Sequence, residues 1–137
     1  MIQQTLLPFF FGVGGRIGPG DQVMPWIHVK DVAGLMAHAV TSQAMSGVYN
    51  TVAPTRVTNA EFTAAYAKAL SRPAIFPVPG IVMKTIFGSE RAAMVLESQT
   101  VVPERTLASG YNYRFGDIKE ACEEFAHLDY HDQDELD

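Results

Sequence analysis

Two histidines near the end of the chain have a spacing that could serve metal chemistry. His127 and His131 are four residues apart, with Asp129 and Asp132 close by, and on a helix this spacing could bind zinc. The helical periodicity ends at this point, so we expect no metal site. Cys122 lies on an apolar stripe without a basic neighbour, which is typical of a packing residue rather than a nucleophile.

A glycine-rich segment, residues 11–20, suggests a second kind of chemistry, the binding of a dinucleotide. Its glycines include the spacing G-x-G-x-x-x-G. A dinucleotide loop needs a buried strand before it and a helix N-terminus after it, so that backbone N–H groups meet the pyrophosphate. Here Pro8 interrupts the preceding segment, and the turn formers Pro19, Gly20 and Asp21 follow. We therefore expect a loop with tight turns and no cofactor bound by this chain alone.

Three segments have the periodicity of an amphipathic helix, and each follows a residue that can cap it. These helices are expected after Asp31, Thr58 and Asp117. Glu61 completes a capping box with Thr58, and Asn59 is a neighbour of that cap. Asp31 is expected to be an N-cap, a role worth about 1 kcal/mol. The apolar stripe of the first helix is Val32, Leu35, Met36, Ala39 and Val40.

Short β-type runs alternate with these helices. Strands are expected at residues 26–29, 47–52 and 74–78, and further helical segments at 81–87 and 90–98. Such alternation predicts an α/β fold with a parallel sheet. Two or three strands do not make a stable parallel sheet. The chain is therefore expected to be the C-terminal part of a doubly wound, Rossmann-like fold plus a small substrate-side domain, with the N-terminal nucleotide-binding strands missing.

Composition restricts the partners and the compartment. The net charge is −5 and the ten basic residues are scattered, which argues against nucleic acid or an anionic membrane as a partner. No apolar run is long enough to span a bilayer. The single cysteine fits an intracellular, reducing compartment, either the cytoplasm or an organelle such as the mitochondrion. We expect one substrate-side region over residues 1–128 and an acidic, disordered tail over 129–137.

The order of short motifs resembles the extended and atypical short-chain dehydrogenases, over about residues 5 to 126. The most similar branch is the epimerase family proteins with their characteristic C-terminal domain. The motifs are the stretch from Arg16 to Ala33 that contains Ile-His-Val and Asp31, then Gly47–Asn50, Ala53-Pro54, Thr58–Phe62, Val102–Arg105 and Leu107–Tyr111. The resemblance implies NAD(P) as the cofactor of the full-length family member.

Two sequence features that the resemblance implies for the family's active enzymes, in the other half of their chains, are absent from this chain. The resemblance implies an N-terminal glycine-rich nucleotide loop and a Tyr-x-x-x-Lys pair, in which the Tyr is the acid/base and the Lys lowers its pKa. None of the five tyrosines is followed by Lys at the fourth position. We therefore expect no catalytic residue here.

The resemblance also places the substrate cleft near the end of the Ile-His-Val segment. The substrate-binding candidates are Arg16, Gln22, Trp26, His28 and Arg105. His28, with Asp31, could orient a substrate hydroxyl, but it could equally be one polar residue of a strand. Arg16 could bind a phosphate or carboxylate, or it could be an exposed charge. Trp26 could pack over a ligand or pack in the hydrophobic core. Arg105 precedes a turn that could close over the cleft.

Many extended members have an Arg just before the Ile-His-Val strand, where this chain has Pro25-Trp26. This departure argues against a nucleotide-sugar substrate. Two functions remain open. The chain is expected to be a substrate-side fragment of an NAD(P)-dependent oxidoreductase or epimerase-like protein, inactive alone because hydride chemistry needs the cofactor against the substrate. Alternatively it is a non-catalytic interaction module whose exposed apolar sheet and helix surfaces bind a partner or a second copy.

Overall fold

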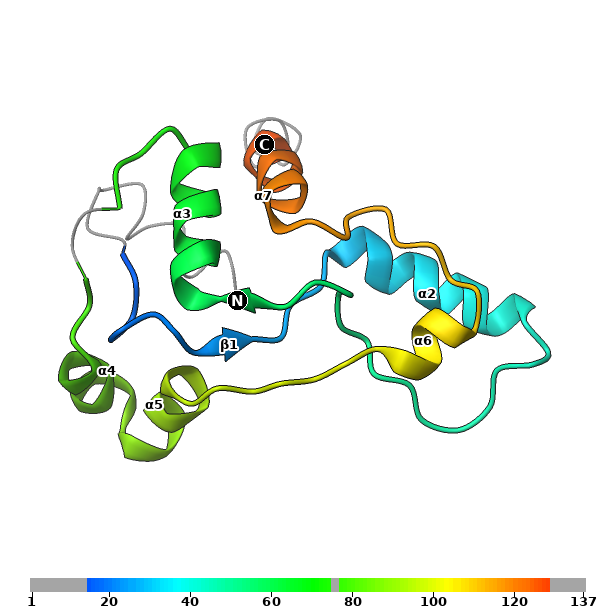
Figure 1. Ribbon diagram of the computed structural model, residues 1–137, viewed down its shortest axis with the longest axis horizontal. Coiled ribbons are helices and arrows are strands. Elements are labelled where there is room, and N and C mark those ends of the chain that lie inside the picture. Colours follow the sequence, from blue (N-terminus) through cyan, green and yellow to red (C-terminus); the bar gives the residue numbers. More distant parts are fainter. Residues whose placement is uncertain (1–14, 75–76, 129–137) are drawn as a thin grey trace, which may run out of the picture.

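The computed structural model describes residues 15–74 and 77–128. Within them the chain is a mixed helix and strand structure (Figure 1). The elements are β1 (Val23–Met24), α2 (Val29–Thr41), β2 (Val57–Thr58), α3 (Asn59–Ala69), α4 (Gly80–Phe87), α5 (Ser89–Leu96), α6 (Glu104–Ala108) and α7 (Ile118–Leu128). The helices α2 and α6 extend to one side of the β1–β2 pair, and α3, α4 and α5 lie on the other (Figure 1).

The strands differ most from the expectation. β1 and β2 pair antiparallel, with Val23 opposite Thr58, and the parallel contact in the described residues is a single bridge from Ile17 to Val78. The expected strands at 26–29 and 47–52 are wrong for this structure, because neither forms a ladder. A strand needs a ladder of hydrogen bonds to a neighbouring strand, and the two segments are joined by a single backbone hydrogen bond, from the Ala53 N–H to the Trp26 carbonyl at 2.7 Å. Part of the third expected strand, residues 75–76, lies outside the described residues.

The first long helix forms as predicted, but its N-cap is not Asp31. α2 begins at Val29, and its N-cap is His28, whose Nδ1 accepts a hydrogen bond from the Lys30 N–H at 3.2 Å. Asp31 lies inside the first turn. Its carboxylate is engaged with a distant loop, so a residue three positions earlier takes over the capping.

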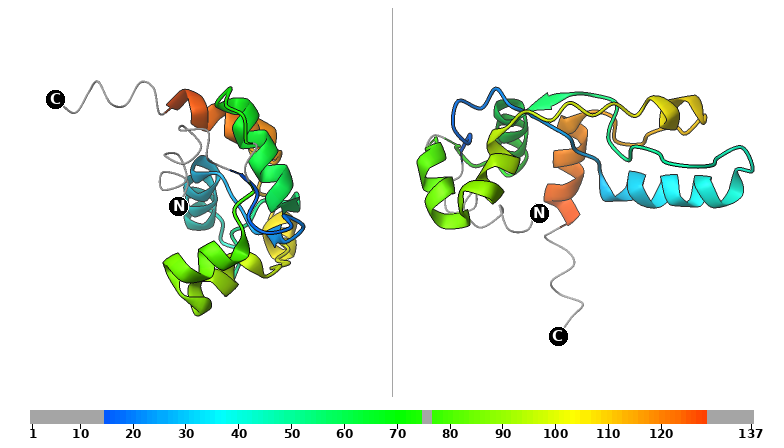
Figure 2. Two further views of the ribbon diagram at one scale, coloured as in Figure 1. Left: turned by 90° about the vertical axis from the view of Figure 1, so that its left-hand side faces the viewer. Right: turned by 90° about the horizontal axis from the view of Figure 1, so that it is seen from below.

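The other two expected helices begin where their capping residues predict. Thr58 and Glu61 form the full capping box at the start of α3, and the Lys119 N–H donates to the Asp117 carboxylate at 2.7 Å before α7. The two helices pack against each other around Tyr66 and Cys122, which are both buried (Figure 2). This pair is the described hydrophobic core.

The α4 and α5 helices form a second, smaller helical pair joined at Gly88, whose φ of 81° favours glycine. They occupy the expected segments 81–87 and 90–98, although the second ends at Leu96. Each helix in the described part of the chain is too short or too polar to span a bilayer.

Candidate functional site

Asp31 anchors a loop that is distant in sequence. It is fully buried, and its carboxylate accepts hydrogen bonds from the Arg114 N–H at 2.8 Å and the Phe115 N–H at 2.9 Å. The Tyr111 hydroxyl donates to the same carboxylate at 3.0 Å and lies 3.1 Å from the Asp31 main-chain oxygen. Gly34 allows this approach, because a Cβ there would be 2.4 Å from the Tyr111 hydroxyl. The role of Asp31 is thus to fix the 111–115 segment on α2.

Tyr111 is hydrogen-bonded to a carboxylate, but it is not suited to acid/base chemistry. Burial first, and then its hydrogen bond to Asp31, raises the pKa of Tyr111 to about 12. An efficient acid/base catalyst has a pKa near the working pH. Tyr111 is therefore a structural partner of Asp31.

His28 is the candidate whose surroundings best fit a ligand contact. It is 6% exposed, and its ring lies 4.1 Å from the Phe115 ring, measured between centroids. Because Nδ1 accepts from Lys30, the proton of the neutral ring is on Nε2. Nε2 is buried and has no hydrogen-bond partner among the described residues. Burial lowers the pKa of His28, although the charge of Asp31 partly opposes this. The neutral ring can therefore donate one hydrogen bond.

His28 lines a small cavity between the start of α2 and the α3–α7 pair. Its volume is about 50 Å³, enough for one water molecule or one ligand group, since a water's share of liquid volume is about 30 Å³. Trp26 and Cys122 also line it. A carbonyl or hydroxyl oxygen placed there could accept the His28 hydrogen bond.

Of the other predicted substrate residues, Trp26 lines the same cavity as His28, whereas Gln22 and Arg16 do not. The Trp26 indole N–H donates to the Thr55 carbonyl at 3.0 Å. Gln22 is buried beside β1, where its amide donates to the Ile17 carbonyl at 3.1 Å. Arg16 is exposed and lines a separate cavity of about 310 Å³ beside α3.

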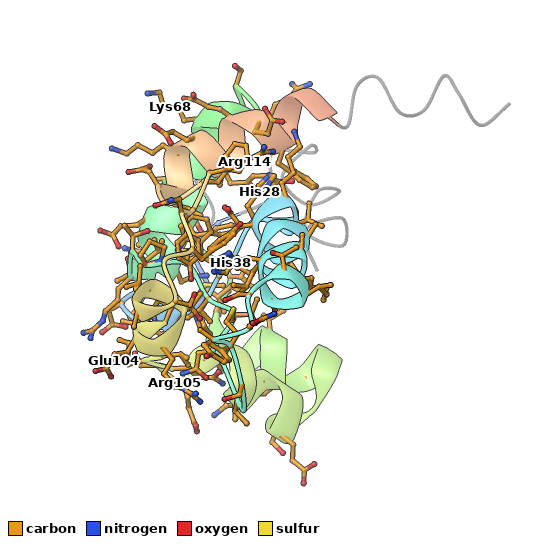
Figure 3. All side chains as sticks on the ribbon, turned by 90° about the vertical axis from the view of Figure 1, so that its right-hand side faces the viewer. His28, His38, Lys68, Glu104, Arg105 and Arg114 are labelled. Carbon is orange, nitrogen blue, oxygen red and sulfur yellow. The ribbon has the colours of Figure 1, made fainter. Side chains whose placement is uncertain are left out.

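Arg105 contacts a loop of its own chain. It lies within α6, well apart from His28 (Figure 3). Its guanidinium donates to the Val48 carbonyl at 2.6 Å and to the Ser46 carbonyl at 2.8 Å, and it lies 4.5 Å above the ring centre of Tyr49. The guanidinium thus holds a loop of this chain, and the expected ligand contact of Arg105 stays a prediction.

Cys122 has the packing role expected for it. It is buried, and burial raises the pKa of its thiol to about 11, so the thiolate is not populated near neutral pH. Within residues 15–74 and 77–128, no three His, Cys, Asp or Glu side chains could hold a metal ion. The prediction that His127 and His131 bind no zinc concerns side chains that lie outside the described ones.

Comparison with known proteins shows where this structure belongs. Residues 78–125 match a family described as a domain of unknown function, DUF1731. The chain is 51% identical over 124 residues to the epimerase family protein SDR39U1 of Bos taurus, covering 90% of this chain and 42% of the relative. It is 49% identical to the protein of that name in Homo sapiens, covering 87% of this chain and 41% of the relative. This chain is therefore similar to the C-terminal domain of the epimerase family proteins.

Solved structures of the epimerase family agree with this assignment. The crystal structure of the human epimerase family protein SDR39U1 (isoform 2) with NADPH matches with a TM-score of 0.89 and 47% identity, over 92% of this chain and 43% of that chain. A nucleoside-diphosphate sugar epimerase from Corynebacterium glutamicum matches with a TM-score of 0.61 and 25% identity, over 98% of this chain and 25% of that one. The chain thus spans about two fifths of the length of its curated relatives.

The described part of the glycine-rich segment, residues 15–20, does not fit the phosphates of a nucleotide. Residues 11–14 lie outside the described ones. After them, the Ile17 N–H donates to the Asn59 side chain at 2.7 Å, and the Gly18 N–H donates to the Val78 carbonyl at 2.9 Å. These N–H groups face protein oxygens, and a turn rather than a helix follows them. The described part of the segment is therefore no phosphate cradle.

Two residues that organise this domain were missed from the sequence. In the sequence Tyr111 is the end of a family motif and a tyrosine without a Lys four residues on, and neither feature indicates its role. Asn59 was interpreted as a neighbour of a cap, yet it is buried and joins the Ile17 loop to the start of α3. Their partners lie 80 and 42 residues away in the chain, so no local pattern could have indicated them.

Proposed function

We propose that this chain is the substrate-side part of an NAD(P)-dependent oxidoreductase or epimerase-like protein, and that it has no such activity alone. The observation that supports this most is the close structural match to 43% of a human relative described with NADPH. The cofactor would then be bound mainly by the part of the protein that corresponds to the remaining length.

The chain's own residues support this division. Hydride transfer needs a cofactor held against the substrate, and the described glycine loop uses its Ile17 and Gly18 N–H groups internally. The tyrosines lack a Lys four residues on. His28 can supply a buried hydrogen-bond donor at the edge of the domain, and we propose that it contacts a carbonyl or hydroxyl oxygen of the substrate.

The proposal is tested by titrating the purified chain with NADPH and with NADH while the fluorescence of Trp26, its single tryptophan, is followed. We expect no saturable quenching up to about millimolar cofactor, a Kd range that corresponds to about −4 kcal/mol. Saturable binding in the micromolar range would contradict the proposal, because it would show a complete cofactor site in this chain.

A second candidate function, a non-catalytic interaction module, is favoured by the exposure of apolar side chains on α2 and at Val48. Such surfaces commonly mark protein contacts. A monomer at all concentrations in light scattering, together with no stable partner, would argue against it. The single cysteine supports an intracellular, reducing location for either function.

A further inference from the structure

The His28 ring presents an unused hydrogen-bond donor to the small cavity at the start of α2. Its Nδ1 accepts from the Lys30 N–H at 3.2 Å, so the proton of the neutral ring is on Nε2. That nitrogen is buried and has no hydrogen-bond partner among the described residues. A buried donor without an acceptor is destabilising, and in folded proteins such groups are generally paired. The donor therefore defines a position for one acceptor atom in the cavity.

A second polar group of the cavity is also a donor near neutral pH. Cys122 lines the same space as His28. Burial raises the pKa of its thiol to about 11, so the sulfur keeps its proton and can act as a weak S–H donor. Tyr66 is fully buried and lines the cavity as well, and its hydroxyl can donate or accept. These groups together favour an acceptor over a donor as the occupant.

The rest of the cavity wall is apolar. It consists of side chains from the segment before α2 and from the α3–α7 pair, including Trp26, Phe62, Ile118, Ala121 and Phe125. None of the described residues in this wall is a Lys, Arg, Asp or Glu. An ionised carboxylate or phosphate would lose its hydration here without gaining a counter-charge. The wall therefore selects against anions and in favour of uncharged groups.

A carbonyl oxygen matches these surroundings better than a hydroxyl group. It has two lone pairs and needs donors alone, whereas a hydroxyl also brings a proton that must find an acceptor. A sugar ring would bring several hydroxyls against an apolar wall, and each of them would need a partner. The volume of about 50 Å³ also restricts the occupant to a short end group, since a water's share of liquid volume is about 30 Å³.

We infer that this cavity is a binding site for the uncharged, carbonyl-bearing end of a small apolar molecule, whose carbonyl oxygen accepts a hydrogen bond from His28 Nε2. This inference rests on the proposed function and deepens it, because it names the chemical class of the substrate group that contacts His28. It also assigns a role to Ala121. A larger side chain at this position would fill the space, so Ala121 sets the size of the group that enters.

The test uses acetone, 2-propanol and acetate, three molecules of similar shape that differ in the chemistry of their oxygens. Each is titrated into the purified full chain with isotope-labelled histidine, and the ring signals are followed by NMR at neutral pH. We expect acetone to shift the His28 ring signals saturably, with a Kd in the millimolar range because so small a ligand makes few contacts. Binding should be several-fold weaker for 2-propanol and about tenfold or more weaker for acetate, whose charge the wall does not compensate.

His38 is an internal control in the same spectra. It lies in the last turn of α2, ten residues after His28 (Figure 3), and its Nε2 is 3.0 Å from the Ser109 carbonyl oxygen. Its signals should not move. Ala121→Val should fill the cavity and weaken acetone binding by about tenfold or more. The matched control is Ala64→Val, the same change at an exposed position of α3, which should leave the affinity unchanged.

Equal effects of acetone and acetate on the His28 signals would overturn the inference, as would His38 shifts as large as those of His28. Binding of 2-propanol as tight as that of acetone would refute the carbonyl class, and acetone binding that survives Ala121→Val would refute the site. If Ala121→Val fails to fold, the comparison of the three molecules on the parent chain decides.

Titration of the same chain with NADPH separates this inference from the proposed function. Selective acetone binding together with micromolar NADPH binding would leave the cavity site standing and refute the proposed function. Absence of both acetone binding and NADPH binding would refute the cavity site alone.

Discussion

Replacing Asp31 by alanine distinguishes a loop anchor from a helix cap. In the structure this substitution leaves the N–H groups of Arg114 and Phe115 without their acceptor, while Tyr111 keeps the Asp31 main-chain oxygen at 3.1 Å. A buried donor left unsatisfied costs about 1–3 kcal/mol. Two such donors predict a loss of about 2–6 kcal/mol in the free energy of unfolding, whereas loss of an N-cap would cost about 1 kcal/mol.

Urea denaturation followed by circular dichroism measures this loss. The control is Asp117→Ala, since Asp117 is an exposed residue that accepts one hydrogen bond, from the Lys119 N–H, at a helix start. Asp31→Asn gives a milder change, because the amide oxygen can still accept from one of the two donors. An Asp31→Ala loss no larger than that of Asp117→Ala would refute the anchor role.

Three further predictions concern the cap of α3 and two titrating side chains. Thr58→Ala should lower the free energy of unfolding by about 1 kcal/mol, measured in urea, because the α3 capping box is lost. Tyr111→Phe should remove from the ultraviolet titration the phenol that ionises at about 12. Because the folded pKa exceeds the unfolded one, stability that depends on Tyr111 should fall above about pH 10. His28, whose folded pKa is lowered from 6.5, should make the parent chain lose stability as the pH falls below that value. His28→Asn keeps a cap acceptor and should be less sensitive to acid in the same urea experiment, and equal acid sensitivity would contradict the prediction.

The helices were predictable because their signals are local. The capping box of Thr58 and Glu61 and the stripes at helical spacing all lie within one or two turns of the residues they affect. A helix satisfies its backbone within its own segment, so its sequence carries most of the information. The starts of α3 and α7 agree with this reasoning.

The strands and the anchor were not predictable in the same way. A strand takes its hydrogen bonds from another segment, and the composition of residues 47–52 could not show that the described chain lacks that segment. Asp31 is a good capping residue by type, and its partners come from residues 111–115, about 80 positions away. Residue type alone could not separate a cap from an anchor.

His28 combines a helix cap with an unused hydrogen-bond donor. The sequence left a strand residue and a ligand contact about equally open; the structure shows a helix cap in place of the strand residue, and the ligand contact stays a prediction. Nδ1 accepts from Lys30 and caps α2, which fixes the tautomer and leaves the proton on Nε2. Nε2 is buried without a described partner, so capping itself prepares the donor that a substrate oxygen could use. Because the His28 ring both caps α2 and carries the Nε2–H donor, the position of that donor depends on the start of helix α2.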